Sequence, residues 1–321
     1  MNIQLINPYT KLLFVQTDKG LKDEKGNFYP YINGAYKLTG DDNYTDNFGF
    51  QWNKFAKTQI DKESKSSIQS KTRFFAQTNW DKEDLSGKDM LEVGSGAGRF
   101  SQVVLDYTKA NLYSVDYSNA VEVNFKNNGH HGQRLKLFQA SIYDLPFQQQ
   151  SFDKVFCFGV LQHTPDVKKS VESLAAMVKP GGELVVDFYP IRGWWTKIHA
   201  KYFLRPITKK MSHEKLLRKI EKNIDWLISV SNFFNRIGIG RVANRLLPIC
   251  DIKGTFPPGL TKTEIREWCI LDTFDMFSPE YDQPQKVKTV AKWFEEFGFK
   301  DVKAGFIKFD NNSSAVVRGI K

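Results

Sequence analysis

Residues 89–100 read Asp-Met-Leu-Glu-Val-Gly-Ser-Gly-Ala-Gly-Arg-Phe, and this stretch decides the fold. Its first part, Met90 to Val93, is apolar enough for a buried strand and runs directly into a glycine-rich turn. The residues after the turn place Phe100, Val103 and Val104 at helical spacing. The stretch therefore predicts a strand, a tight turn and a helix. Glycines in such a turn let a ligand approach the backbone, and the helix N-terminus behind them favours negative charge.

A second predicted strand, Leu112 to Val115, ends on an acid, Asp116. A carboxylate in that position can accept two hydrogen bonds from a ribose diol. Both features also have purely structural interpretations, because glycines build ordinary turns and Asp116 could cap the helix that begins near Ala120. They lie, however, at the carboxyl ends of adjacent strands, where open α/β sheets bind ligands. We therefore favour a nucleoside-type cofactor site.

The glycine spacing separates two classes of cofactor. The dinucleotide fingerprint G-x-G-x-x-G would need a glycine at position 99, which is Arg99. The spacing Gly94-x-Gly96-x-Gly98 instead resembles that of class I S-adenosylmethionine-dependent methyltransferases. Three later segments resemble this family in the same order. They are Ala140 to Phe147 (adenine-contacting loop), Phe152 to His163 (fourth strand and turn) and Val178 to Val186 (turn and fifth strand).

The resemblance implies roles for individual residues. Glu92 and Gly94 would lie near the methionyl part of S-adenosylmethionine, and Asp116 would hold the ribose hydroxyls. Ser141 stands where the family often has Asp, so the backbone of Ile142 would do more of the adenine recognition. Arg73 could pair with the methionyl carboxylate, although a solvated surface position is equally compatible with the sequence. The remaining expected cofactor contacts are Ser95, Gly96, Gly98, Tyr117, Phe158 and Gly159.

The resemblance and the strand–helix alternation predict an α/β fold, a Rossmann-like, doubly wound, mostly parallel seven-stranded sheet. We expect a methyltransferase core from residues 86–190 and 284–321. Residues 1–45 predict a small β-rich head, and residues 46–85 a helical cap or lid. Residues 191–283 predict a basic helical insertion that acts as a lid over the acceptor.

Composition indicates a cytoplasmic enzyme. The 321 residues hold only three cysteines (Cys157, Cys250 and Cys269), too few and too scattered for a disulfide framework or a metal cluster. No metal site is expected, and Cys157 should be a small core residue. No apolar run reaches the roughly 18 residues of a membrane span, and the N-terminus lacks a signal-peptide pattern.

Candidate residues for the acceptor side are fewer. His163 follows the fourth strand and could act as a general base, because imidazole titrates near neutral pH; a packing role is at least as compatible. Trp52 lies in an aromatic-rich helix and could face the sulfonium cation, or simply hold that helix to the sheet. Asp272, Asp275 and Tyr281 fall in a loop-like stretch, residues 271–282, where relatives build acceptor sites. Turn and capping roles remain open for each of these three.

The charge of the chain is concentrated in one segment. Residues 191–250 contain thirteen Lys and Arg and three Asp and Glu, a net charge of +10, and the whole chain also has +10. Basic residues accompany an apolar helical pattern from Leu216 to Ile228. Such a helix can contact an anionic membrane, bind nucleic acid, or pack on its own domain. We expect this helix to pack on its own domain, which is the commonest case. Peripheral contact with an anionic membrane remains an open alternative.

Three functions compete. The favoured one is methyl transfer from S-adenosylmethionine to a small-molecule or glycan or lipid-linked acceptor, because the chain resembles uncharacterised bacterial methyltransferases of that kind. The second is an RNA or protein methyltransferase. Against it, Phe158-Gly159-Val160-Leu161 replaces the Asn/Asp-Pro-Pro-Tyr signature of amino-directed nucleic-acid enzymes. The third is a non-catalytic cofactor-binding scaffold. The sequence identifies neither the acceptor nor the oligomeric state.

Overall fold

A central sheet organises the computed structural model, which describes residues 3–40, 43–63, 69–253, 255–257, 259–310 and 312–321. Seven of its strands lie in the order β7-β6-β5-β8-β9-β11-β10. The parallel strands are β5 (Asp89–Val93), β6 (Asn111–Asp116), β7 (Leu135–Gln139), β8 (Phe152–Cys157) and β9 (Val178–Phe188). The hairpin of β10 (Lys300–Phe309) and β11 (Asn312–Ile320) adds antiparallel to β9. This arrangement confirms the predicted fold class.

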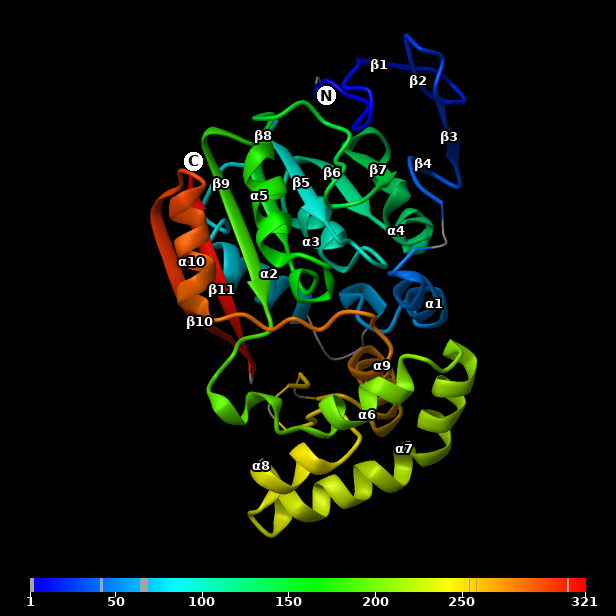
Figure 1. The fold of residues 1–321 in the computed structure, drawn as a ribbon, viewed down its shortest axis with the longest axis vertical. Coiled ribbons are helices and arrows are strands. Elements are labelled where there is room, and N and C mark those ends of the chain that lie inside the picture. Colours follow the sequence, from blue (N-terminus) through cyan, green and yellow to red (C-terminus); the bar gives the residue numbers. More distant parts are fainter. Residues whose placement is uncertain (1–2, 41–42, 64–68, 254, 258, 311) are drawn as a thin grey trace.

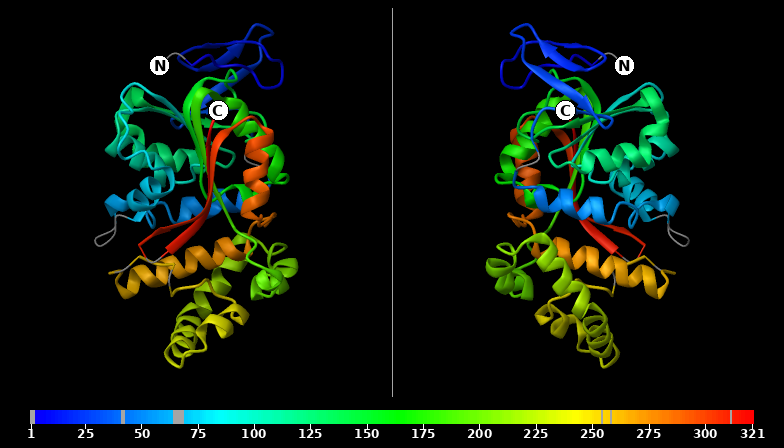
Figure 2. Two further views of the ribbon diagram at one scale, coloured as in Figure 1. Left: turned by 90° about the vertical axis from the view of Figure 1, so that its left-hand side faces the viewer. Right: turned by 90° about the vertical axis from the view of Figure 1, so that its right-hand side faces the viewer.

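Helices cover both faces of this sheet (Figure 2). On one face, α5 (Val167–Met177) and α10 (Val287–Glu296) bury Val171, Leu174, Val290 and Phe294. On the other, α2 (Gln69–Thr78) and α3 (Arg99–Tyr107) bury Phe74, Phe100 and Val103, and α4 (Ala120–Asn128) packs beside α3. Cys157 is buried in the sheet, as expected. Short 3₁₀ turns connect these elements: η1 (Asp61–Glu63), η2 (Gly129–Arg134) and η3 (Leu161–His163).

The N-terminal strands extend the sheet. They are β1 (Phe14–Gln16), β2 (Gly20–Asp23), β3 (Phe28–Ile32) and β4 (Ala35–Lys37). β4 pairs in parallel with β7, so the sheet runs to eleven strands. Leu21, Tyr36 and Leu38 belong to the same apolar core as Phe138 and Phe147. These strands therefore close an edge of the central sheet while forming the end of the molecule seen at the top of Figure 1.

Residues between β9 and α10 build a separate helical layer at the opposite end of the molecule (Figure 1). Its elements are η4 (Trp194–Lys197), α6 (Ala200–Thr208), α7 (His213–Arg236), α8 (Gly240–Ala243), η5 (Asn244–Leu246) and α9 (Lys262–Phe277). Leu217, Ile220 and Ile224 of α7 pack against Leu271 and Phe274 of α9 in a second apolar core. That core also takes in Phe55, which follows α1 (Asp46–Lys54). The layer is thus fixed to the helices that precede the sheet.

The two connections of this layer lie side by side. Pro190 forms a parallel bridge with Gln285, whose backbone N–H donates to Tyr189 O at 2.9 Å. Ile191 N–H in turn donates to Gln285 O at 2.8 Å. The chain therefore leaves and re-enters the sheet domain through one paired neck. Among the helices that the structure describes, none combines the length and apolar character that crossing a bilayer requires.

One expectation about this layer was wrong. Residues 271–282 were expected to form a loop, but α9 continues as a helix to Phe277. The helix begins with a capping box in which Thr261 and Glu264 each satisfy the other's backbone N–H. Its apolar residues Ile270, Phe274 and Phe277 are buried. Because burial of this face outweighs the weak helix propensity of Asp and Thr, the helix ends only before Pro279.

Candidate functional site

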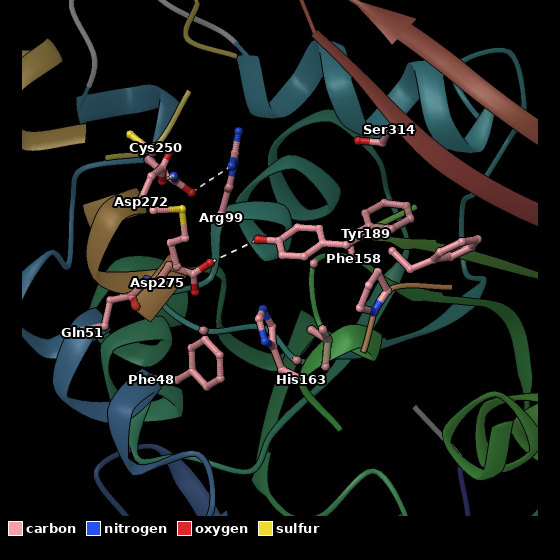
Figure 3. A pocket seen from close by; sticks show the side chains of 18 of the residues that line it. Phe48, Gln51, Arg99, Phe158, His163, Tyr189, Cys250, Asp272, Asp275 and Ser314 are labelled. Carbon is pink, nitrogen blue, oxygen red and sulfur yellow. Dashed lines mark hydrogen bonds between the residues drawn. The ribbon is translucent and has the colours of Figure 1, made fainter. Parts of the chain in front are cut away.

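A cavity of about 670 Å³ opens at the carboxyl ends of β5, β6 and β8 (Figure 3). Its floor is the loop after β5, and its walls come from α1, α2 and the helical layer. The predicted residues that line it are Trp52, Arg73, Gly94, Ser95, Gly96, Asp116, Tyr117, Ile142, Phe158, Gly159, His163, Asp272 and Asp275. The structure thus brings most of the expected cofactor and acceptor residues to one space.

Backbone geometry explains two of the glycines. Gly94 and Gly96 have φ angles of +83° and +52°, which residues with side chains rarely adopt. A Cβ atom on Gly96 would come within 2.8 Å of Trp52 Nε1, and one on Gly94 within 2.1 Å of Val160. Glycine at these positions therefore lets Trp52 and Val160 close over the loop.

Asp116 is held in place by backbone and side-chain donors. Gly96 N–H donates to Asp116 Oδ2 at 2.7 Å, and Ser118 donates to Oδ1 from its N–H at 2.8 Å and from Oγ at 2.6 Å. Burial raises the pKa of Asp116, and these hydrogen bonds oppose the rise. The carboxylate is fixed at the cavity wall, where Oδ2, which accepts a single hydrogen bond, has a second lone pair for a ligand.

Four predicted residues do not line the cavity in the described structure: Glu92, Gly98, Ser141 and Tyr281. Gly98 begins α3 against Asn124 and Asn128, where a Cβ atom would be 2.2 Å from Asn124 Oδ1. Ser141 Oγ accepts from the N–H of Tyr143 within its own turn. Tyr281 turns its ring toward Tyr44 and contributes only its carbonyl to the site. Their expected direct contacts with ligands are therefore not supported.

Glu92 points away from the cavity into a polar network beneath the loop. Its Oε2 accepts from the hydroxyls of Ser101 and Ser114. Its Oε1 is buried without a partner among the described residues. Burial is the largest cause that raises the pKa of Glu92, to about 7. Glu92 thus supports the loop from below and does not line the cavity.

His163 is buried at the cavity wall between the rings of Phe48 and Tyr189 (Figure 3). Its Nδ1 lies 3.0 Å from the carbonyl oxygen of Tyr281. A carbonyl only accepts, so Nδ1 must carry the proton and Nε2 is left with a lone pair in the neutral ring. Burial lowers the pKa of His163, although Asp275 and the Tyr281 carbonyl oppose this. His163 is therefore neutral at pH 7.

Arg73 has a protein partner that the sequence did not reveal. Its Nη2 donates to Asp187 Oδ2 at 2.5 Å, and Asp187 Oδ1 accepts from the N–H of Gly159 at 2.5 Å. The Nε atom of Arg73 is buried without a partner among the described residues. Arg73 consequently joins α2 to the ends of β8 and β9 and retains one donor at the cavity.

The acceptor side contains a cluster of acidic and phenolic groups. Tyr189 Oη donates to Asp275 Oδ2 at 3.2 Å, the contact drawn in Figure 3. Burial and the neighbouring Asp275 raise the pKa of Asp272 to about 7, and Arg99 opposes the rise. Burial also lowers the pKa of Arg99, to about 10. A polar acceptor group would therefore find both donors and acceptors here.

Several lining residues were not predicted. They come from segments far apart in sequence: Tyr44, Phe48, Arg99, Tyr189, Arg192, Trp195, Lys201 and Arg245. Arg99 was noted only as the residue that breaks the dinucleotide fingerprint. Tyr189 follows the fifth predicted strand directly, so its place at a strand end was a usable signal. Tyr44 and Phe48 come from the segment at α1, and Arg192, Trp195, Lys201 and Arg245 depend on how the helical layer folds back, which no local pattern encodes.

A possible metal-ligand group lies outside the cavity lining. Ligand atoms of Asp106, His130 and His131 lie within 4.8 Å of one another. The Asp106 carboxylate already pairs with Lys62 Nζ at 2.9 Å. A cation there would compete with a fixed ammonium group, so the expectation of no metal site stays a prediction.

Residues 91–186 match the sequence model of the methyltransferase domain family. This segment is a class I S-adenosylmethionine-dependent methyltransferase domain. It contains the glycine loop, Asp116 and His163, and it ends within β9. The rest of the cavity wall, from α1, α2 and the helical layer, lies outside the matched segment of this methyltransferase domain.

Curated relatives share this methyltransferase domain with different named activities. A tRNA U34 carboxymethyltransferase of Nautilia profundicola is 30% identical over 111 residues, which cover 34% of this chain and 37% of that protein. A ubiquinone biosynthesis O-methyltransferase of Coxiella burnetii is 34% identical over 101 residues, 31% of this chain and 43% of that protein. The chain thus spans 37% and 43% of the length of these two relatives.

Solved structures resemble the chain over a longer range. Magnesium protoporphyrin IX methyltransferase from Synechocystis with bound S-adenosylmethionine has a TM-score of 0.46 at 13% identity. The superposition covers 88% of this chain and 92% of that one.

Proposed function

We propose that the chain transfers a methyl group from S-adenosylmethionine to a hydroxyl of a small-molecule or glycan-type acceptor, lipid-linked acceptors included. In this proposal Gly94, Gly96 and Asp116 hold the cofactor, and His163 accepts the proton of the acceptor hydroxyl. The helical layer, residues 191–283, forms the lid over the acceptor. We assign these roles to the domains with the boundaries predicted from the sequence.

The cavity suits the cofactor in chemical terms. Asp116 offers its carboxylate to a ribose diol beside the loop of Gly94 and Gly96, over which Trp52 and Val160 pack. Two residues that line the cavity, Arg73 and Ser95, each have a buried polar atom (Nε and Oγ) without a partner among the described residues. Such atoms are ordinarily hydrogen-bonded, so they suit a ligand with carboxylate or amine groups. When bound, S-adenosylmethionine supplies a methyl group on a positively charged sulfur.

The observation that supports transfer to a hydroxyl is the tautomer of the neutral His163 ring. With Nδ1 donating to Tyr281 O, the Nε2 lone pair is available to accept a proton. Phe48 and Tyr189 fix the ring in its orientation and shield it from water. Alignment of the acceptor by the surrounding side chains would supply much of the remaining rate.

A second candidate is methylation of RNA. The net charge of residues 191–250 and the tRNA named as substrate of the Nautilia relative favour it. The match covers only 34% of this chain and 37% of that relative, so it does not identify the acceptor. A third candidate is a non-catalytic scaffold. It would bind the cofactor but would not form S-adenosylhomocysteine.

Two measurements test the proposal. Isothermal titration should give micromolar affinity for S-adenosylmethionine and S-adenosylhomocysteine, and tighter binding of NAD would overturn the cofactor assignment. Asp116→Ala removes the carboxylate that would accept from the ribose diol in charge-assisted hydrogen bonding, so affinity should fall at least roughly tenfold. Asp18→Ala, an exposed matched control far from the cavity lining, should leave it unchanged.

Product formation then separates the candidates. Release of S-adenosylhomocysteine is measured with pools of hydroxylated small molecules and glycans, and in parallel with total tRNA. Turnover with the first pools supports the proposal, and turnover with tRNA alone replaces it by the second candidate. Cofactor binding without turnover on any pool would favour the scaffold.

A further inference from the structure

The long helix α7 is apolar on two separate faces. One face packs into the second core and consists of Leu217, Ile220, Ile224 and Leu227. The other is exposed: Trp226 and Phe233 keep 60% and 57% of their surface accessible, and Ile237, directly after the helix, keeps 51%. Positions 226, 230, 233 and 237 recur every three or four residues, which places them on one side of the helix. A helix that packs on its own domain needs only the first face.

Lysines continue the exposed side toward the start of the helix. At 100° per residue, Lys215, Lys219 and Lys222 fall on the same side as Trp226 and Phe233. All three are exposed, and none forms an ion pair within the part of the chain that is described. We call the seven residues Lys215, Lys219, Lys222, Trp226, Val230, Phe233 and Ile237 the outer face of α7.

Acidic residues of the helix are kept off this face. Asp225 pairs with Arg266 of α9 at 2.9 Å, and Arg266 also donates to the carbonyl of Glu221. These contacts place the acidic side against α9. The outer face of α7 is therefore basic in its first half and apolar in its second, with no opposing charge on it.

Neighbouring segments enlarge the apolar part. Ile239 and Val242 follow the end of α7, and Val242 is 70% exposed. Leu246 lies in η5, where Arg245 donates to the carbonyl of Trp195 at 2.7 Å and so ties η5 to η4. Trp194, in η4, is 81% exposed. Figure 1 shows α7 and α8 together at the end of the molecule away from the N-terminal strands.

We propose that the outer face of α7, with the adjoining apolar residues of η4, α8 and η5, docks on an anionic membrane surface. An exposed apolar area of this kind marks an interaction site. Lysine ammonium groups gain from anionic lipid headgroups, and tryptophan and phenylalanine suit the interfacial region of a bilayer. RNA would match the lysines, but the aliphatic Ile237, Val242 and Leu246 offer no face on which bases stack.

The docking surface adjoins the cavity. Trp195 and Arg245 line it, while Trp194 is directed to solvent. Docking would therefore bring the cavity wall to the lipid surface, where an acceptor with a lipid anchor resides. That consequence for the acceptor rests on the proposed function, whereas docking itself does not.

Co-sedimentation of the full chain with vesicles tests the docking. Vesicles of phosphatidylcholine alone are compared with vesicles that contain phosphatidylserine, at low and moderate salt. We expect binding only to the anionic vesicles, weakened by salt. Reversing three lysines (Lys215→Glu, Lys219→Glu and Lys222→Glu) should lower the partition coefficient about a hundredfold, because each contributes roughly tenfold or less near such a surface.

Controls separate a specific face from net charge. The matched variant Lys300→Glu, Lys303→Glu and Lys308→Glu changes the same charge on exposed residues of β10 and should retain most of the binding. Trp226→Ser with Phe233→Ser removes the apolar part and should also weaken binding, and circular dichroism and cofactor titration check that each variant folds. Absence of vesicle binding, equal loss in both charge variants, or tighter binding to RNA than to vesicles would each overturn the docking. Cofactor affinity and turnover in solution are measured separately, so their failure would concern the proposed function instead.

Discussion

At the scale of single residues, the proton on His163 decides what the cavity can do. The carbonyl of Tyr281 fixes that proton on Nδ1, and burial keeps the ring neutral at pH 7. A neutral imidazole with a free Nε2 can take a proton, whereas an imidazolium cannot. A pH profile therefore tests the assignment more directly than loss of activity alone.

We expect His163→Ala to reduce kcat at least a hundredfold while leaving cofactor affinity unchanged, because general base catalysis contributes about 10²–10⁴ in rate. Burial lowers the pKa of His163 from its ordinary value, so the wild-type rate should persist below pH 6.5 and fall only at lower pH. Rates against pH, with cofactor binding titrated separately, measure both effects. The exposed His130→Ala serves as control, and normal turnover by a folded His163→Ala would assign the imidazole to packing.

Glu92 should influence stability rather than catalysis. Its pKa is raised to about 7 in the folded chain, from about 4.5. Its contribution is therefore favourable at pH below 4.5 and is lost as the pH rises through 7, because the unfolded state prefers the ionised form. In Glu92→Gln the change in unfolding free energy between pH 4.5 and 8 should differ from wild type by about 2–3 kcal/mol. Urea titrations at the two pH values measure it, and an identical pH dependence would contradict the assignment.

At the scale of elements, local sequence patterns were sufficient to predict the structure where one short segment holds the whole motif. The strand, turn and helix from Asp89 to Tyr107 follow from apolar runs broken by glycine, and all three form as predicted. It was harder to predict which side of a strand or turn faces the ligand. Glu92 points under the loop because one step along a strand reverses the direction of the side chain, and Ser141 accepts from Tyr143 N–H within its own turn.

The misassigned stretch, residues 271–277, shows why residue type alone misleads. Asp272, Thr273 and Asp275 are common in turns, yet they extend α9 because Phe274 and Phe277 are buried beside them. The packing partners on α7 and α1 make this favourable, and they lie far away in the sequence. The gain is that Asp272 and Asp275 reach the cavity from a rigid helix.

The start of α9 offers a test of this rigidity. Thr261 Oγ1 accepts from the N–H of Glu264, and Glu264 Oε2 accepts from the N–H of Thr261. We expect Thr261→Ala to lower the unfolding free energy by about 1 kcal/mol, and Thr261→Ser to restore most of it. Denaturant unfolding of the three proteins provides the comparison. Equal stability of all three would show that packing alone holds the helix.

At the scale of the whole molecule, the N-terminal strands and the central sheet behave as one body. β4 supplies the partner of β7, and Tyr36 packs its ring on Phe138 with centroids 5.2 Å apart. The sequence indicated a small β-rich head but could not show that it closes a sheet edge. That pairing joins residues about a hundred positions apart, beyond any local pattern.

Removal of residues 1–40 should therefore expose β7 as an open edge. We expect a lower melting temperature and concentration-dependent aggregation, since Leu21, Tyr36 and Leu38 leave the shared core. Differential scanning calorimetry and light scattering measure the two effects. A truncated chain that melts like the full one and stays monomeric would identify the head as an independent appendage.

The paired neck at Pro190 and Gln285 has a consequence for how such chains can diversify. The helical layer begins and ends at one point of the sheet. A different segment can therefore replace it there without a change in the order of the strands that hold the methyl donor. Among the several hydrogen bonds that cross this boundary is the contact between His163 and residue 281. That contact uses a main-chain carbonyl, which every amino acid provides. Recombination at the neck could therefore replace the acceptor wall and keep the histidine in its working tautomer, whatever side chain arrives at position 281.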